Sequence, residues 1–128
     1  MAYEVPGFML GTLKVASTAF SAKQFHCMVA SSSDGIAVSP SDGASMTGIM
    51  QNAPTVAGEG INLMVDGVSK ARYDTALTAG DNWIVGASGR PASTAGAAAG
   101  AAVYGPVLLT GASSSIGTVS LKSVGITT

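Results

Sequence analysis

The single histidine and the single cysteine of this chain are neighbours, His26 and Cys27, and could form a thiol–imidazole pair or part of a metal site. Successive side chains of an extended strand point to opposite faces, so adjacent residues cannot readily act as nucleophile and base. A tetrahedral zinc site needs four ligands, usually Cys or His, and the chain holds only these two. We expect Cys27 to point inward and His26 to point outward, solvated or at an interface, with no metal bound.

Residues 107–117, VLLTGASSSIG, look like the nucleotide-binding turn of short-chain dehydrogenases. That turn holds pyrophosphate with backbone N–H groups and a following helix N-terminus, inside a larger parallel α/β sheet. Only eleven residues follow Gly117, too few for the helix, the next strand and an acidic ribose-binding residue roughly 20 positions on. The middle glycine of the motif is also replaced by Ser115. We therefore predict a hairpin loop between two strands.

Other residues with chemical potential also have simpler explanations. No Gly-x-Ser-x-Gly elbow presents a serine nucleophile. Trp83 and Tyr73 could stack on a ligand, but sparse aromatic residues are more often core or interface anchors. No loop alternates acidic residues as a calcium loop does, which favours turn formation as the role of Asp34, Asp42, Asp66, Asp74 and Asp81. We predict that the chain is not an enzyme and needs no cofactor.

The charge balance restricts the partners. Charged residues make up 10% of the chain, six basic against seven acidic, which leaves no electrostatic footprint for nucleic acid or anionic lipid. The start, MAYEVPG, does not resemble a secretory signal, and the longest weakly polar stretch, residues 97–109, is shorter than the ~20 residues of a membrane span. A single cysteine excludes an internal disulfide framework and fits synthesis in a reducing cytosol.

The apolar residues suggest association with other subunits. They make up 47% of the 128 residues but consist largely of Ala, beside 17 Gly, three Phe, three Tyr and one Trp. Core-filling side chains are therefore few, and we expect apolar surface to remain exposed. In a chain of low charge, such surface favours close packing against other protein subunits.

Short apolar stretches bounded by Gly, Asp, Ser and Pro predict strands, since no window sustains a helical period with caps. About nine are expected, over residues 10–17, 25–30, 36–39, 46–50, 61–65, 69–73, 83–85, 103–109 and 118–124. The pairs Asp34-Gly35, Asp42-Gly43 and Asp66-Gly67 place glycine where a tight turn needs positive φ. We predict an all-β fold, a single small antiparallel β-sandwich or β-barrel, in which short 3₁₀ turns could still occur.

Two segments depart from this rhythm. Residues 1–24 contain Pro6, Gly7 and Gly11 around the apolar Phe8, Met9 and Leu10, which suits an extended N-terminal arm in front of a β-rich domain over residues 25–128. Residues 91–102, PASTAGAAAGAA, are almost all small and predict a flexible or loosely packed loop. An Ala-rich helix is the alternative, which two glycines weaken by ~1 kcal/mol each.

Several turn motifs follow one another in a specific order. They are GIMQNAP from Gly48, AGEGINLMVDGVSKA, LTAGDNWIVGASGRPA, YGPVLL and a closing IGTVSLKSV. In this order the chain resembles the decoration (cement) proteins of bacteriophage capsids, over most of its length. The start, with Phe8, Leu10, Gly11, Gln24 and Phe25, also fits. Residues 92–102 and 113–115 depart from the pattern, so contacts made there cannot be carried over.

The resemblance implies a β-rich structural protein that binds the outer surface of an assembled phage head. It also implies the major capsid protein as partner, a homotrimer, synthesis in the bacterial cytoplasm and a place on the virion surface. The apolar start makes Phe8, Met9 and Leu10 candidate contacts with the capsid or a sister subunit. The alternative is a virion surface binding module for carbohydrate or host attachment, such as the base of a head fibre, although the sequence lacks a flat aromatic row for glycans.

Overall fold

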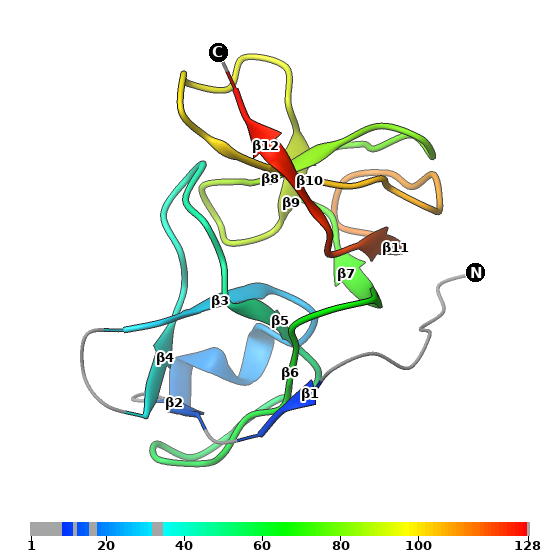
Figure 1. Ribbon diagram of the computed structural model, residues 1–128. Helices are drawn as coiled ribbons and strands as arrows, with labels where there is room; N and C mark the ends of the chain where they lie inside the picture. Colours follow the sequence, from blue (N-terminus) through cyan, green and yellow to red (C-terminus); the bar gives the residue numbers. More distant parts are fainter. Residues whose placement is uncertain (1–8, 12, 16–17, 32–34, 128) are drawn as a thin grey trace.

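The computed structural model describes residues 9–11, 13–15, 18–31 and 35–127, and within them twelve short strands form three sheets (Figure 1). The strands are β1 (Met9–Leu10), β2 (Lys14–Val15), β3 (Cys27–Ala30), β4 (Ile36–Val38), β5 (Gly48–Met50), β6 (Leu63–Met64), β7 (Val68–Arg72), β8 (Trp83–Val85), β9 (Pro91–Ser93), β10 (Ala102–Tyr104), β11 (Ile116–Ser120) and β12 (Ser123–Ile126). The one helical turn in these residues is a 3₁₀ helix, η1 (Thr18–Ala22). The prediction of an all-β domain is confirmed, and no helix in the described residues is long and apolar enough to span a membrane.

The six-stranded sheet contains the first half of the chain, in the order β1-β6-β5-β3-β4-β2. Its pairs are antiparallel except β2 with β4, which run parallel, so the sheet is mixed rather than purely antiparallel as predicted. The turn before β4 uses positive φ at Gly35, as its Asp-Gly sequence predicted. Figure 1 shows this sheet with η1 in the lower part of the molecule.

The second half of the chain forms a four-stranded sheet, β12-β10-β8-β9, and a two-stranded ribbon, β11-β7 (Figure 1). β11 and β7 pair antiparallel along five residues each, and this ribbon lies between the two larger sheets in Figure 1. β9 falls in the segment that was predicted to be a loop. Its first residue, Pro91, sits on an edge strand, where the missing N–H costs no ladder bond.

The predicted strands are longer than the observed ones in the last third of the chain. The strand predicted at 103–109 ends at Tyr104, since Pro106 cannot donate to a ladder. The strand predicted at 118–124 is divided at Leu121 and Lys122, so that β11 pairs with β7 while β12 pairs with β10. Each half of the predicted strand therefore stabilises a different sheet.

The predicted arm, residues 1–24, is described only from Met9 onward. There the structure differs from an extended arm, because β1 pairs with β6 and β2 pairs with β4. Val15 is fully buried in the core of the six-stranded sheet. Residues 9–22 are therefore part of the folded domain, which short strands with Gly and Pro between them did not suggest.

A central core joins all three sheets. It takes Cys27, Ile49 and Met64 from the six-stranded sheet, Trp83 and Tyr104 from the four-stranded sheet, and further residues from the ribbon and the loops beside it, namely Ala71, Tyr73, Leu77, Val85, Val107, Val119 and Leu121. Two smaller clusters lie within the individual larger sheets. The molecule therefore buries its few large side chains mainly where the sheets meet.

Tyr73 is the largest side chain of this core after Trp83 and is fully buried. Its hydroxyl donates to the carbonyl of Leu109 at 2.6 Å and accepts the N–H of Thr118 at 3.1 Å. The ring lies against Gly111 and Gly117, and a Cβ built on Gly117 would be 2.1 Å from the Tyr73 hydroxyl oxygen. Only glycine fits at position 117.

We predict that Gly117→Ala destabilises the protein by roughly 1–3 kcal/mol, the cost of overpacking a filled core. Urea unfolding monitored by circular dichroism measures this change. The matched control is Gly60→Ala, where a Cβ would meet no atom closer than 4.0 Å. Equal stability of the two variants would show that Tyr73 does not fill the space at Gly117.

Candidate functional site

His26 and Cys27 are both buried, so the predicted outward orientation of His26 is wrong. Cys27 has no exposed surface and His26 is 8% exposed. Burial raises the pKa of the Cys27 thiol far above its usual value. Burial, followed by the charges of Lys23, Arg90 and Arg72, lowers the pKa of His26 to about 4. At neutral pH this pair therefore consists of a neutral imidazole and an inaccessible thiol.

The reason for the burial of His26 is a backbone turn at Phe25. Phe25 has a φ of 65°, the left-handed region that non-glycine residues rarely adopt. This turn follows η1, and the His26 N–H donates to the Lys23 carbonyl at 3.0 Å. The segment is therefore not an extended strand at His26, and alternation of faces does not apply. No motif in the sequence signals a left-handed phenylalanine.

The aromatic side chains that could have stacked on a ligand are core residues. Tyr73 and Trp83 have no exposed surface, as the core interpretation predicted. Trp83 stacks on Tyr104, with ring centroids 5.0 Å apart, and its indole N–H donates to Ser120. The Tyr104 hydroxyl in turn accepts the N–H of Met46 at 3.0 Å. These rings hold sheets together rather than face solvent.

The segment that looked like a nucleotide-binding turn, residues 107–117, is a hairpin loop, as predicted. Val107 bridges Val119, and the Leu108 N–H donates to the Thr118 carbonyl at 2.8 Å, so the two ends of the segment run antiparallel. No helix follows it. Its backbone groups bind neighbouring segments, since Gly111 exchanges two 2.9 Å hydrogen bonds with Leu77.

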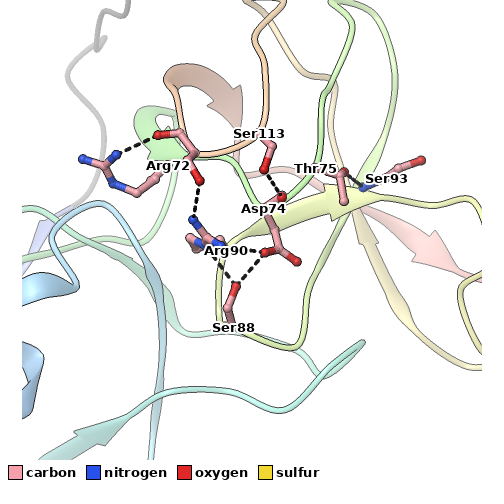
Figure 2. Close-up of polar contacts among 8 residues, drawn as sticks. Arg72, Asp74, Thr75, Ser88, Arg90, Ser93 and Ser113 are labelled. Atoms are coloured by element: carbon pink, nitrogen blue, oxygen red, sulfur yellow. Dashed lines mark hydrogen bonds and ion pairs between the residues drawn. The ribbon is translucent and has the colours of Figure 1, made fainter.

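A polar cluster that sequence reasoning missed lies at the end of β7 (Figure 2). Asp74 accepts hydrogen bonds from Arg90 at 2.8 Å and from the Ser88 hydroxyl at 2.9 Å. The Arg90 Nε also donates to the Ser88 hydroxyl at 2.9 Å. The Ser113 hydroxyl donates to the Asp74 carbonyl, and Arg72 donates to the Ser114 carbonyl. The cluster thus ties the 88–90 turn and the 113–114 loop to β7.

The remaining aspartates act locally where their contacts are known. The Asp66 carboxylate accepts the N–H of Gly67 at 2.9 Å and so braces its own turn, as predicted. The φ of Gly67 is 96° and that of Gly43, after Asp42, is 74°, which confirms both predicted Asp-Gly turns. Among the residues that the structure describes, no three His, Cys, Asp or Glu side chains gather as metal ligands.

Two shallow hollows of about 230 and 220 Å³ flank the small-residue loop after β9. Both are lined by Asp42 and Ile84, together with alanines and glycines of residues 92–101. The lining offers few side chains that could bind a specific ligand. Exposed large apolar residues lie elsewhere, with two on the edge strand β12, Val124 and Ile126, and others at Val56 and Ile116.

The predicted capsid contacts are only partly within the described residues. Phe8 lies outside them. Met9 and Leu10 form β1, and their backbones pair with Met64 and Leu63 of β6. Their role as contacts stays a prediction.

The fold has a counterpart among solved structures. It is similar to the head fibre gp8.5 N base of bacteriophage phi29, with a TM-score of 0.70 over 90% of this chain and 95% of that chain. The two sequences are 12% identical, so the similarity concerns the fold. No family profile and no curated protein sequence matches the chain.

His26 predicts a pH-dependent stability. In the unfolded chain its pKa is near 6.5, and in the folded protein it is about 4. Between these values the unfolded state binds a proton that the folded state does not, so stability falls as pH decreases from 6.5 to 4 and this contribution is constant below. We expect a loss of roughly 2–3 kcal/mol. His26→Gln should lack this component, and identical unfolding free energies against pH in both proteins would contradict it.

Asp74→Ala should destabilise the protein by roughly 1–3 kcal/mol, because it leaves the partly buried guanidinium of Arg90 without its carboxylate. Thermal and urea unfolding measure the change. Asp81→Ala removes the same charge from an exposed turn residue and should cost less than about 0.5 kcal/mol. Equal costs for both substitutions would show that the ion pair does not stabilise the turn.

Proposed function

We propose that this protein is a non-enzymatic structural component of a bacteriophage particle, bound to the outer surface of the assembled head. The observation that carries the proposal is the similarity of fold to a head fibre base domain over nearly the whole of both chains. The order of turn motifs that resembles cement proteins supports the same place on the virion. The partner would be the major capsid protein.

The residues that most suggested chemistry support a structural role. His26 and Cys27 are buried, and burial disfavours the thiolate that nucleophilic catalysis needs. Tyr73 and Trp83 are core residues, and the loop 107–117 uses its backbone groups inside the fold. We therefore propose that the protein acts by binding, without a cofactor.

Two forms of this function remain. As a cement protein, a homotrimer would bridge capsid subunits, and several modest contacts would add through multivalency. As the base of a head fibre, the domain would anchor a projecting structure. The head fibre comparison favours the second form, whereas the motif order favours the first.

Binding to expanded empty capsids tests the proposal. Purified protein is mixed with the capsids, the mixture is sedimented, and bound copies are counted against capsid subunits. We expect saturation at a fixed ratio set by the capsid symmetry. Absence of co-sedimentation, or binding that never saturates, would refute a place on the head.

The same capsids distinguish the two forms. A cement protein should raise the temperature at which the shell comes apart, since it links neighbouring subunits. A fibre base should saturate at fewer sites and leave that temperature unchanged. Calorimetry of bare and saturated capsids gives both answers.

A further inference from the structure

Basic side chains gather around one aromatic residue. The chain has six Lys and Arg residues, and three of them surround Phe25. The ammonium group of Lys70 lies 5.8 Å from the centre of the Phe25 ring, and the backbone N–H of Arg72 donates to the Phe25 carbonyl at 3.1 Å. Lys23 precedes Phe25 by two residues, at the end of the turn after η1.

The alternation of β7 places two of these cations on one face. Ser69 and Ala71 are buried, while Val68, Lys70 and Arg72 are partly exposed. Opposite Arg72, the ribbon partner β11 contributes Ile116, whose side chain is 36% exposed. We call Lys23, Phe25, Lys70, Arg72 and Ile116 the Phe25 patch.

No acidic residue in the described part of the chain forms an ion pair with these cations. The one ion pair found there joins Arg90 to Asp74, so the carboxylate two residues after Arg72 is already engaged. His26, buried beside Phe25, experiences this imbalance. All the charged groups that shift its pKa, Lys23, Arg90 and Arg72, are positive and lower it.

The backbone and the buried polar atoms at this place are also unusual. The left-handed φ of Phe25 costs of the order of 1 kcal/mol or more and has to be maintained by the surrounding structure. Two buried atoms in the described residues lack a hydrogen-bond partner, His26 Nδ1 and Gln51 Oε1. Gln51 is linked to the same turn, because its carbonyl accepts the side chain of Gln24. Such features concentrate at functional positions.

We infer that the Phe25 patch is the surface by which this protein docks on the head, and that the protein surface it meets presents carboxylates to Lys23, Lys70 and Arg72. This inference rests on the proposed function and specifies its contact. Phe25 and Ile116 supply apolar contact between the cations, and aromatic residues and arginine dominate binding energy at protein interfaces. Opposite charges set the orientation and the rate of association.

A protein partner fits this patch better than nucleic acid. Binding to DNA at physiological salt rests on several neutralised phosphates, often 6–10, and the patch has three cations. The chain as a whole carries a formal charge of −1, which does not attract a polyanion. A cluster of carboxylates on a folded surface matches both the number of cations and the apolar groups between them.

The test compares two double variants with the same change in charge. Lys23→Glu/Lys70→Glu reverses the patch, and Lys14→Glu/Lys122→Glu reverses two exposed lysines elsewhere, on β2 and between β11 and β12. Each substitution changes the charge by two, so both proteins change from −1 to −5. Affinity for expanded empty capsids is measured by co-sedimentation at several salt concentrations, after circular dichroism has shown both to be folded.

We expect the patch variant to bind at least about tenfold more weakly, and the control to bind within about threefold of the wild type. Wild-type affinity should fall as salt rises, and the patch variant should have lost that dependence. If Lys23→Glu/Lys70→Glu does not fold, Lys23→Gln/Lys70→Gln should show the same weakening to a smaller degree.

Equal weakening in both double variants, or none in the patch variant, would overturn the inference while leaving capsid binding by the wild type intact. Failure of the wild type to bind capsids would instead remove the proposed function, and the inference with it. Tight binding of the wild type to duplex DNA, lost in the patch variant alone, would identify phosphate as the partner group and overturn the assignment of carboxylates.

Discussion

The buried hydroxyl of Tyr73 is the constraint on which the arrangement of the sheets depends. A buried phenol needs hydrogen-bond partners, and here they are the Leu109 carbonyl and the Thr118 N–H on both sides of one hairpin. The ring can approach that hairpin only because Gly111 and Gly117 have no side chains. Tyr73 therefore fixes the hairpin against β7, and β11, β10 and β12 take their positions from it.

The next residue holds the other side of the molecule. Asp74 donates its N–H to the Pro91 carbonyl at 2.7 Å, and its carboxylate binds Arg90 and Ser88. The end of β7 thus binds the hairpin through Tyr73 and the β8–β9 connection through Asp74. Because successive residues of a strand face opposite ways, one short segment can join the two-stranded ribbon to the four-stranded sheet.

Local turn chemistry was predictable, whereas long-range polar contacts were not. Asp-Gly pairs identified the positive φ at Gly43 and Gly67, since only glycine adopts that conformation without strain. The ion pair between Asp74 and Arg90 joins residues 16 apart, and nothing in their spacing indicates it. The burial of His26 depends on the left-handed turn at Phe25, which no residue-type preference announces. The chain direction at such a point is decided by tertiary packing.

These two levels also explain what a similar fold at 12% identity can carry. Turns and small residues at close approaches determine the fold, and they can be kept while the surface changes. The contact surface must therefore be found in the charges of this chain itself. Half-buried cations without acidic partners repel one another and lose hydration, so they do not stabilise the free protein. Their accumulation around Phe25 is energetically reasonable when a partner supplies the missing negative charge.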